Sequence, residues 1–213
     1  MAKLPKIEKV VLKLPEGRLS YAFLANPKPK PPKNGKEVAP RYETAVLLDP
    51  SVPVQKAAID ALKADALRVA HAAFGSNVEM KKLVLGFGNG DKKAIDEDGG
   101  INPSYEAYKG MYYVNTSSAD KPLIANRRGA LVDKTDAQFP YSGCYANVKV
   151  TLYPWTFTEN NMTRRGISVD LRSIQFVRDG EAFGGRVAIN PEEEFEALGD
   201  APGAVDDDSF NFD

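Results

Sequence analysis

The sequence predicts a mainly β domain with one or two helices, folded as a small closed or half-closed barrel with long loops. Residues 111–176 contain several short segments in which polar and apolar residues alternate, the period of a β-strand. The only clear helical period lies just before Gly75. The last 24 residues carry nine acids and no Lys or Arg. We therefore expect one domain over residues 1–189 and a flexible acidic tail over residues 190–213.

The N-terminal region combines a strand with a basic loop. Residues 19–24 are typical of a strand, whereas residues 26–36 contain four prolines, which remove backbone donors and prevent helix formation. This segment is predicted to be an extended basic loop. It is either a solvated connector or a flexible arm that lies along phosphates.

A second strand and the main helix come next. Residues 41–48 read as a strand, and the prolines at 50 and 53 end it, with Ser51 as the expected helix cap. Apolar residues then recur at spacings of three and four, and Gly75 supplies the stop. The pattern indicates an amphipathic packing helix.

Residues 86–108 are rich in Gly, Asp and Asn and are predicted to form a long surface loop. A phosphate-binding loop would deliver a Lys-Ser/Thr pair at a helix start, but Asp91 follows the glycines instead.

The C-terminal half is predicted to be strands. Residues 111–117 and 122–126 are spaced as a hairpin, and residues 144–153 alternate between a core face and a face of aromatic, amide and cationic side chains. The apolar phase changes between residues 166–171 and 174–176, which predicts a bulge near Arg172 or Ser173.

The near-neutral net charge of −1 conceals a strong division. Nine of the 29 acids lie after residue 189, which leaves 20 acids against all 28 bases before it, so a body of +8 carries a tail of −9. A basic body attracts polyanions such as nucleic acid, and the tethered tail offers a competing anion. The alternative is a tail that serves only solubility, against which its phenylalanines argue.

Several classes are disfavoured by composition. The single cysteine, Cys144, and single histidine, His71, exclude an internal disulfide and the usual zinc clusters, so we expect no metal and no cofactor. No apolar stretch is long enough to span a membrane, and the charged N-terminus is unlike a signal peptide.

Single-stranded DNA exposes base faces, so a protein that binds it needs cations for the backbone and flat side chains for stacking. This sequence interleaves both, although an aromatic ring in a β-protein more often belongs to the core than to a binding face. The candidate DNA contacts are Lys28, Lys30, Lys33, Arg41, Lys109, Tyr112, Tyr113, Arg127, Arg128, Lys149, Tyr153, Trp155, Phe157, Arg164 and Arg165. The candidate partner-binding residues of the tail are Asp206, Asp207, Asp208, Phe210 and Phe212.

Residues 141–145 (YSGCY), 148–157 and 174–186 (IQFVRDGEAFGGR) resemble a tailed-bacteriophage family first catalogued without a function. Residues 18–21 (RLSY) and 112–118 (YYVNTSS) are similar to it as well. That family is similar to the phage replication single-stranded DNA-binding proteins.

The resemblance implies an OB-fold, a five-stranded barrel that binds single-stranded DNA without sequence preference during phage replication or recombination. It implies contacts from Arg41 and from an aromatic on the strand at residues 153–157, and a tail that recruits polymerase and primase-helicase and competes with DNA. The aromatic of the tail is penultimate here, with Asp213 after Phe212. The implied location is the cytoplasm of the infected host, with no enzymatic activity and no membrane partner. A homodimer is left open.

Two alternatives from other classes stay open. A magnesium-dependent nuclease would need clustered carboxylates, and the only dense set in the body is Asp91, Asp96, Glu97 and Asp98. A phage structural or scaffold protein would use the basic body to bind a protein partner.

Overall fold

The computed structural model describes residues 5, 7–32, 35, 37–96, 98–159 and 162–183. The predicted tail, with Asp206, Asp207, Asp208, Phe210 and Phe212, lies outside the described residues, as does Lys33.

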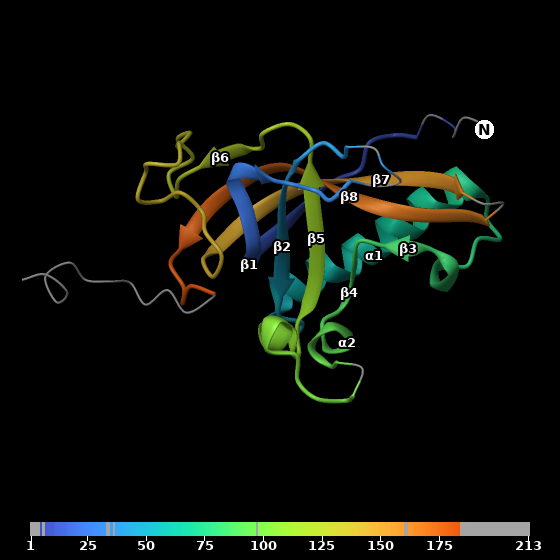
Figure 1. The fold of residues 1–213 in the computed structure, drawn as a ribbon, viewed down its shortest axis with the longest axis horizontal. Coiled ribbons are helices and arrows are strands. Elements are labelled where there is room, and N and C mark those ends of the chain that lie inside the picture. The colour runs from blue at the N-terminus through green and yellow to red at the C-terminus, as the bar shows by residue number, and fades with distance from the viewer. Residues whose placement is uncertain are drawn as a thin grey trace, which may run out of the picture. The chain divides into compact units, whose positions relative to one another are not determined.

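Five strands form a partial ring, seen in Figure 1. They are β1 (Val11–Lys28), β2 (Arg41–Leu48), β5 (Tyr112–Ser118), β7 (Tyr145–Glu159) and β8 (Met162–Arg178). Antiparallel pairing joins them in the order β8, β7, β1, β2, β5, and β5 meets β8 through the single pair Ser117 and Asp170. The prediction of a mainly β, half-closed fold is confirmed.

Short elements decorate this ring. The strands are β3 (Val84–Leu85) and β6 (Leu123–Ala125), both parallel to β8, and β4 (Phe87–Asn89), antiparallel to β5. The helices are α1 (Pro53–Phe74) and α2 (Asp91–Ala94), with 3-10 turns η1 (Met80–Lys82) and η2 (Pro103–Tyr108). No helix in the described ranges is both long and apolar enough to cross a bilayer.

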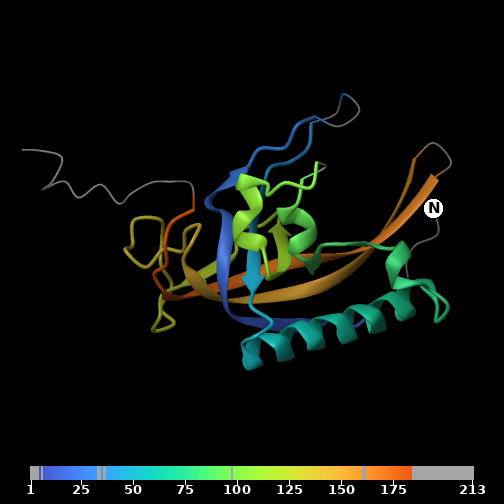
Figure 2. The same ribbon diagram turned by 90° about the horizontal axis from the view of Figure 1, so that it is seen from below.

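Helix α1 covers one side of the ring, opposite α2 and the β1–β2 connection (Figure 2). Its buried stripe includes Ile59, Leu62 and Val69, which join the main core with residues of β1, β2, β7 and β8. Gly75, with φ at 93°, ends the helix as predicted. The predicted cap is wrong, because Val52 precedes the first turn and the Ser51 hydroxyl instead bonds the Asp49 carboxylate at 2.6 Å.

Strand β7 follows its predicted alternation. Val148 and Val150 are fully buried, whereas Lys149 and Tyr153 are exposed. Lys149 pairs with Ser173 but Val150 pairs with Leu171, so Arg172 is the extra residue of a bulge, as the change of phase predicted.

The predicted hairpin of residues 111–126 is wrong. Strand β5 pairs with β2 and β4, whereas β6 lies parallel to β8. The four residues between the two segments suggested a local turn, but each segment finds a partner that is distant in sequence.

The segment 86–108 is not a simple surface loop. It contains β4, α2 and all of η2, and the side chains of Phe87 and Tyr108 are buried. A Cβ added at Gly90 would lie 2.1 Å from the Tyr108 carbonyl oxygen, so close packing requires this glycine. The glycine-rich composition predicts a loop, whereas at least Gly90 is required by close packing.

Candidate nucleic-acid interface

The outward face of β2 and β5 carries a cleft. Register places Glu43 opposite Ser117 and Ala45 opposite Asn115, while Val46, the next residue along β2, points into the core. The cleft has a volume of ≈ 320 Å³. Its aromatic and charged lining residues, from β1, β2, α2 and η2, are Tyr21, Lys28, Glu43, Lys93, Tyr105 and Tyr108.

Tyrosines pack in a chain along this cleft. The ring centroids of Tyr21 and Tyr105 are 5.9 Å apart, those of Tyr105 and Tyr108 are 5.2 Å apart edge to face, and those of Tyr108 and Tyr113 are 6.0 Å apart. Burial raises the pKa of Tyr108 to about 12. The rings hold one another in place, as aromatic pairs in these geometries do.

Lys93 reaches over the same rings from α2. Its ammonium nitrogen lies 4.1 Å from the ring centroid of Tyr113 and 5.4 Å from that of Tyr108. Burial lowers the pKa of Lys93, because the charged form loses water. Its one hydrogen bond to another side chain in the described part of the chain is a long one, 3.5 Å, to Asn115 Oδ1.

Two of the lysines predicted to bind phosphate form ion pairs with one carboxylate. Lys28 Nζ lies 3.0 Å from Glu43 Oε1, and Lys30 bonds the other oxygen of Glu43. Burial alone would raise the pKa of Glu43, but these hydrogen bonds hold it below the usual value. Strand β1 continues to Lys28, so the predicted basic loop begins later than expected.

Arg41 stands at the start of β2, opposite Lys28. Its Nε donates to Ser117 Oγ at 3.3 Å, which places the guanidinium at the rim of the cleft. Of the predicted site residues, Lys28, Lys30 and Arg41 therefore gather at this end of the β2–β5 face.

The hairpin arm, formed by residues 153–159 of β7 and 162–168 of β8, presents a second set. Cross-strand pairs put Tyr153 with Ser168, Trp155 with Gly166 and Phe157 with Arg164 on one face. Tyr153 and Phe157 are 63% and 41% exposed, whereas Trp155 is partly covered.

Arg165 points to the other face of the arm, because neighbouring residues of a strand alternate. Its guanidinium carbon lies 5.6 Å from the ring centroid of Phe74 in α1. Of these two neighbouring candidates, only Arg164 therefore shares the face of the arm that carries Tyr153, Trp155 and Phe157.

The remaining predicted residues lie elsewhere. Tyr112 faces away from Tyr113, packing on Phe87 with ring centroids 6.4 Å apart and under Lys63. Lys109 follows η2 and is exposed. Lys149 is exposed in the middle of β7, opposite Lys13 of β1.

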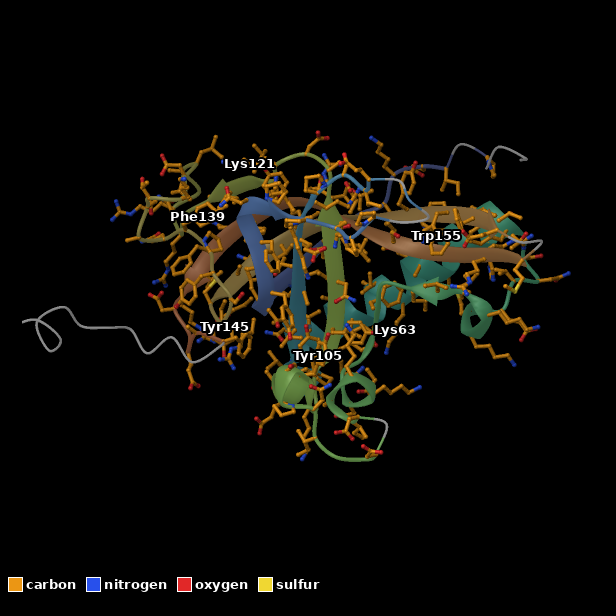
Figure 3. All side chains as sticks on the ribbon, viewed as in Figure 1. Lys63, Tyr105, Lys121, Phe139, Tyr145 and Trp155 are labelled. Atoms are coloured by element: carbon orange, nitrogen blue, oxygen red, sulfur yellow. The ribbon has the colours of Figure 1, made fainter. Side chains whose placement is uncertain are left out.

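Arg127 and Arg128 belong to the turn after β6, where Gln175 Nε2 donates to the Arg127 carbonyl at 3.3 Å. Gln175 is nine residues along β8 from Gly166, the partner of Trp155, or roughly 30 Å at the usual rise of a strand. Figure 3 shows Trp155 in the right half of the view and Tyr105 at the lower centre, near α2. The predicted residues therefore do not converge on one cleft.

Sequence reasoning missed Tyr21, Lys93 and Tyr105. The spacing of Tyr105 and Tyr108, with the Lys92–Lys93 pair upstream, was the available signal, but the glycine-rich composition around it favoured a loop.

Two acids of the nuclease alternative accept hydrogen bonds from the backbone. Asp91 Oδ1 accepts from the Gly110 amide at 2.7 Å, and Asp96 Oδ1 accepts from the Gly100 amide at 2.7 Å. No three His, Cys, Asp or Glu side chains come together as a metal site anywhere in the described ranges.

The order of the five ring strands and the cleft on the second and third of them define an OB-like domain. The family model described as "Enterobacter phage Enc34, ssDNA-binding protein" matches residues 8–209, and the chain belongs to this family. A relative from Acyrthosiphon pisum secondary endosymbiont phage 1, "Putative protein p50", is 35% identical over 141 residues, 66% of this chain and 71% of that protein.

Solved structures share the fold. The single-stranded DNA-binding protein from bacteriophage Enc34 in complex with ssDNA is 22% identical, with a TM-score of 0.55 over 86% of this chain and 100% of that chain. The single-stranded DNA-binding protein gp2.5 of bacteriophage T7 is 14% identical, with a TM-score of 0.54 over 92% of this chain and 100% of that chain.

The position of the cleft can be compared with the ligand-binding face of OB-folds. OB-folds bind oligonucleotides on the face of their second and third strands and with the loops that join strands one to two and four to five. In this chain those strands are β2 and β5, and those loops follow β1 and β7. The cleft lies on that face, and the arm ends at the second loop.

Proposed function

We propose that this chain binds single-stranded DNA without sequence preference and acts as a binder, not an enzyme. The observation that carries the proposal is a cleft of tyrosines and lysines on the β2–β5 face, in a chain that belongs to a family of phage ssDNA-binding proteins. Stacking on rings and attraction of phosphates are the two requirements of such a site.

The contacts divide between the two regions. Tyr153, Trp155 and Phe157 of the arm supply rings on which successive bases stack. Arg41 at the rim of the cleft and Arg164 on the arm attract the backbone, whereas Lys28 and Lys30 are held by Glu43. Lys109, Lys149, Arg127 and Arg128 lie outside both regions and contribute only to the general positive field.

We further propose that the protein coats displaced strands in phage DNA replication or recombination, in the cytoplasm of the infected host. The tail, with its nine acids, competes with DNA for the basic body and recruits replication proteins such as polymerase and primase-helicase. Phe210 and Phe212 would anchor it to a partner.

The test is a gel-shift titration of the full chain on single-stranded and duplex oligonucleotides of equal length. We expect retention of oligo-dT at physiological salt in preference to duplex, and quenching of Trp155, the single tryptophan. Equal binding to duplex, or no binding, would overturn the proposal and favour a structural protein. Magnesium-dependent shortening of the oligonucleotide, abolished in D96N/D98N, would favour the nuclease.

A further inference from the structure

Tyr21 has a backbone conformation that non-glycine residues rarely adopt. Its φ is 51°, and it lies within the register shift of β1 between Ser20 and Phe23. The surroundings hold it there, because Tyr21 Oη donates to the Ser104 carbonyl at 2.9 Å and its ring packs on Tyr105. The ring is nevertheless 41% exposed. Strain maintained for an exposed ring is typical of a functional position.

Lys93 forms another wall of the same cleft. It is partly buried against three tyrosine rings, and none of the carboxylates in the described segments forms an ion pair with it. An ammonium group has three donors. Only the 3.5 Å contact with Asn115 Oδ1 engages them among the described side chains, so the cation retains capacity to donate into the cleft.

The cleft favours a base over a phosphate. Glu43 lines it and remains ionised, held by Lys28 and Lys30, so a phosphate inside would meet a carboxylate. The buried hydroxyls of Thr44 and Thr116 donate to backbone carbonyls, at 3.1 and 2.9 Å, and are not available as anion donors. The volume of ≈ 320 Å³ is at the lower end of the range for small-ligand pockets, about 300–1,000 Å³.

We propose that this cleft is a pocket for one unpaired nucleobase, which lies flat on Tyr21 while a carbonyl oxygen on its edge accepts a hydrogen bond from Lys93. The inference rests on the proposed binding of single-stranded DNA and adds a defined subsite. Tyr105 and Tyr108 support the platform from behind, and Asn115 positions the ammonium group.

A pair of neighbouring lysines on α2 provides the matched experiment. K93M and K92M each remove one positive charge from the same short helix, so they weaken the long-range attraction of DNA equally, but Lys92 is exposed and does not line the cleft. We expect K93M to weaken binding of the full chain to oligo-dT about tenfold or more, as loss of a charge-assisted hydrogen bond does. K92M should weaken it less than about threefold.

Equal losses in the two variants would overturn the pocket. Thermal unfolding of both variants shows whether either change acts through the fold. If the wild-type chain binds oligo-dT and both variants bind it equally weakly, the pocket is overturned but the proposed function stands. Failure of the wild-type chain itself to bind oligo-dT would overturn both proposals.

Photo-crosslinking tests the pocket without altering the protein. An oligonucleotide containing 5-iododeoxyuridine couples to aromatic side chains that stack on it, and peptide mapping identifies the residue. We expect a crosslink at Tyr21 in addition to any on the arm. Crosslinks confined to Tyr153, Trp155 and Phe157 would contradict the pocket, even with binding itself demonstrated.

Discussion

The cleft and the hairpin arm both place aromatic rings beside cations, but they hold them in different ways. In the cleft, tyrosines from β1, η2 and β5 pack on one another and on Lys93, so their positions are fixed before any ligand arrives. On the arm, Tyr153 is 63% exposed and Phe157 41% exposed, on two strands that continue beyond the ring. The cleft is therefore suited to one defined base, and the arm to a variable run of bases.

The largest effect should follow removal of the arm's exposed rings. Y153A/F157A should weaken binding to oligo-dT by about 2–6 kcal/mol, at about 1–3 kcal/mol per stacked base, with little change in the dependence of log K on log salt. Fluorescence anisotropy at several salt concentrations measures both quantities. Met162, 63% exposed on the same arm, offers the control M162A, which removes apolar surface without a ring. Equal losses in both variants would mean that the arm does not stack bases.

Substitutions at two glycines compare how tightly the arm and the surroundings of Tyr113 are packed. A Cβ at Gly166 would lie 2.4 Å from both Trp155 Cζ2 and the Val84 carbonyl oxygen, whereas one at Gly88 would meet Tyr113 at an ordinary 3.4 Å. G166A should lower the free energy of unfolding by about 1–3 kcal/mol and shift Trp155 emission, and G88A should do neither. Denaturant titration followed by tryptophan fluorescence measures the difference. A stable G166A with unchanged emission would show that the arm accommodates the methyl group freely.

Deleting residues 190–213 should make the cations of the cleft and of the arm more available to DNA and should leave base stacking on their rings unchanged. We expect roughly fivefold tighter binding near 50 mM salt and a smaller gain near 200 mM, because screening weakens a tethered anion. Titrations of the full and truncated chains at both salt concentrations provide the measurement. In F210A/F212A the charges are intact, so DNA affinity should stay at the wild-type level. Affinity unchanged by the deletion would refute the competition while leaving DNA binding in place.

The smallest effect concerns Glu43, which holds Lys28 and Lys30 at the cleft. E43Q should tighten binding by about twofold to fivefold, because two lysines become available to phosphates. Glu79 forms the same kind of group with Lys81 and Lys82 near the end of α1, so E79Q is its matched control and should leave binding unchanged. Equal tightening in both would indicate a general charge effect.

The lowered pKa of Glu43 also predicts a pH dependence of stability. A carboxyl whose pKa is lower in the folded state stabilises the fold above its unfolded value, about 4.3, and loses this contribution as pH falls through the folded value. The stability advantage of the wild type over E43Q should therefore shrink as pH is lowered from about 6 towards 3. Thermal unfolding across this range is the measurement, and a constant difference would contradict the ion pairs.

Local patterns could be predicted, and non-local pairings could not. The alternation of β7 and the bulge at Arg172 depend on a period of two, which the sequence displays directly. The same period places Arg164 and Arg165 on opposite faces of the arm.

Contacts between distant segments produced the remaining errors. Lys28 and Lys30 resembled a free basic arm because the register that brings them to Glu43 includes two shifts in β1, which no local pattern reveals. The cleft is assembled from five separate segments, and its key lysine lies in a glycine-rich stretch typical of loops. The sequence therefore predicts which kinds of side chain form the site, but not where in the fold they come together.

The pairing of β1 has a consequence for biogenesis. Arg18 is opposite Leu47 on one edge of β1 and opposite Tyr145 on the other, so the first strand emerges from the ribosome long before its second neighbour exists. Such high contact order slows folding and leaves a hydrogen-bonding edge exposed to aggregation in the meantime. Translation that stops before β8 should yield insoluble fragments, whereas loss of the residues after 183 spares every strand of the ring.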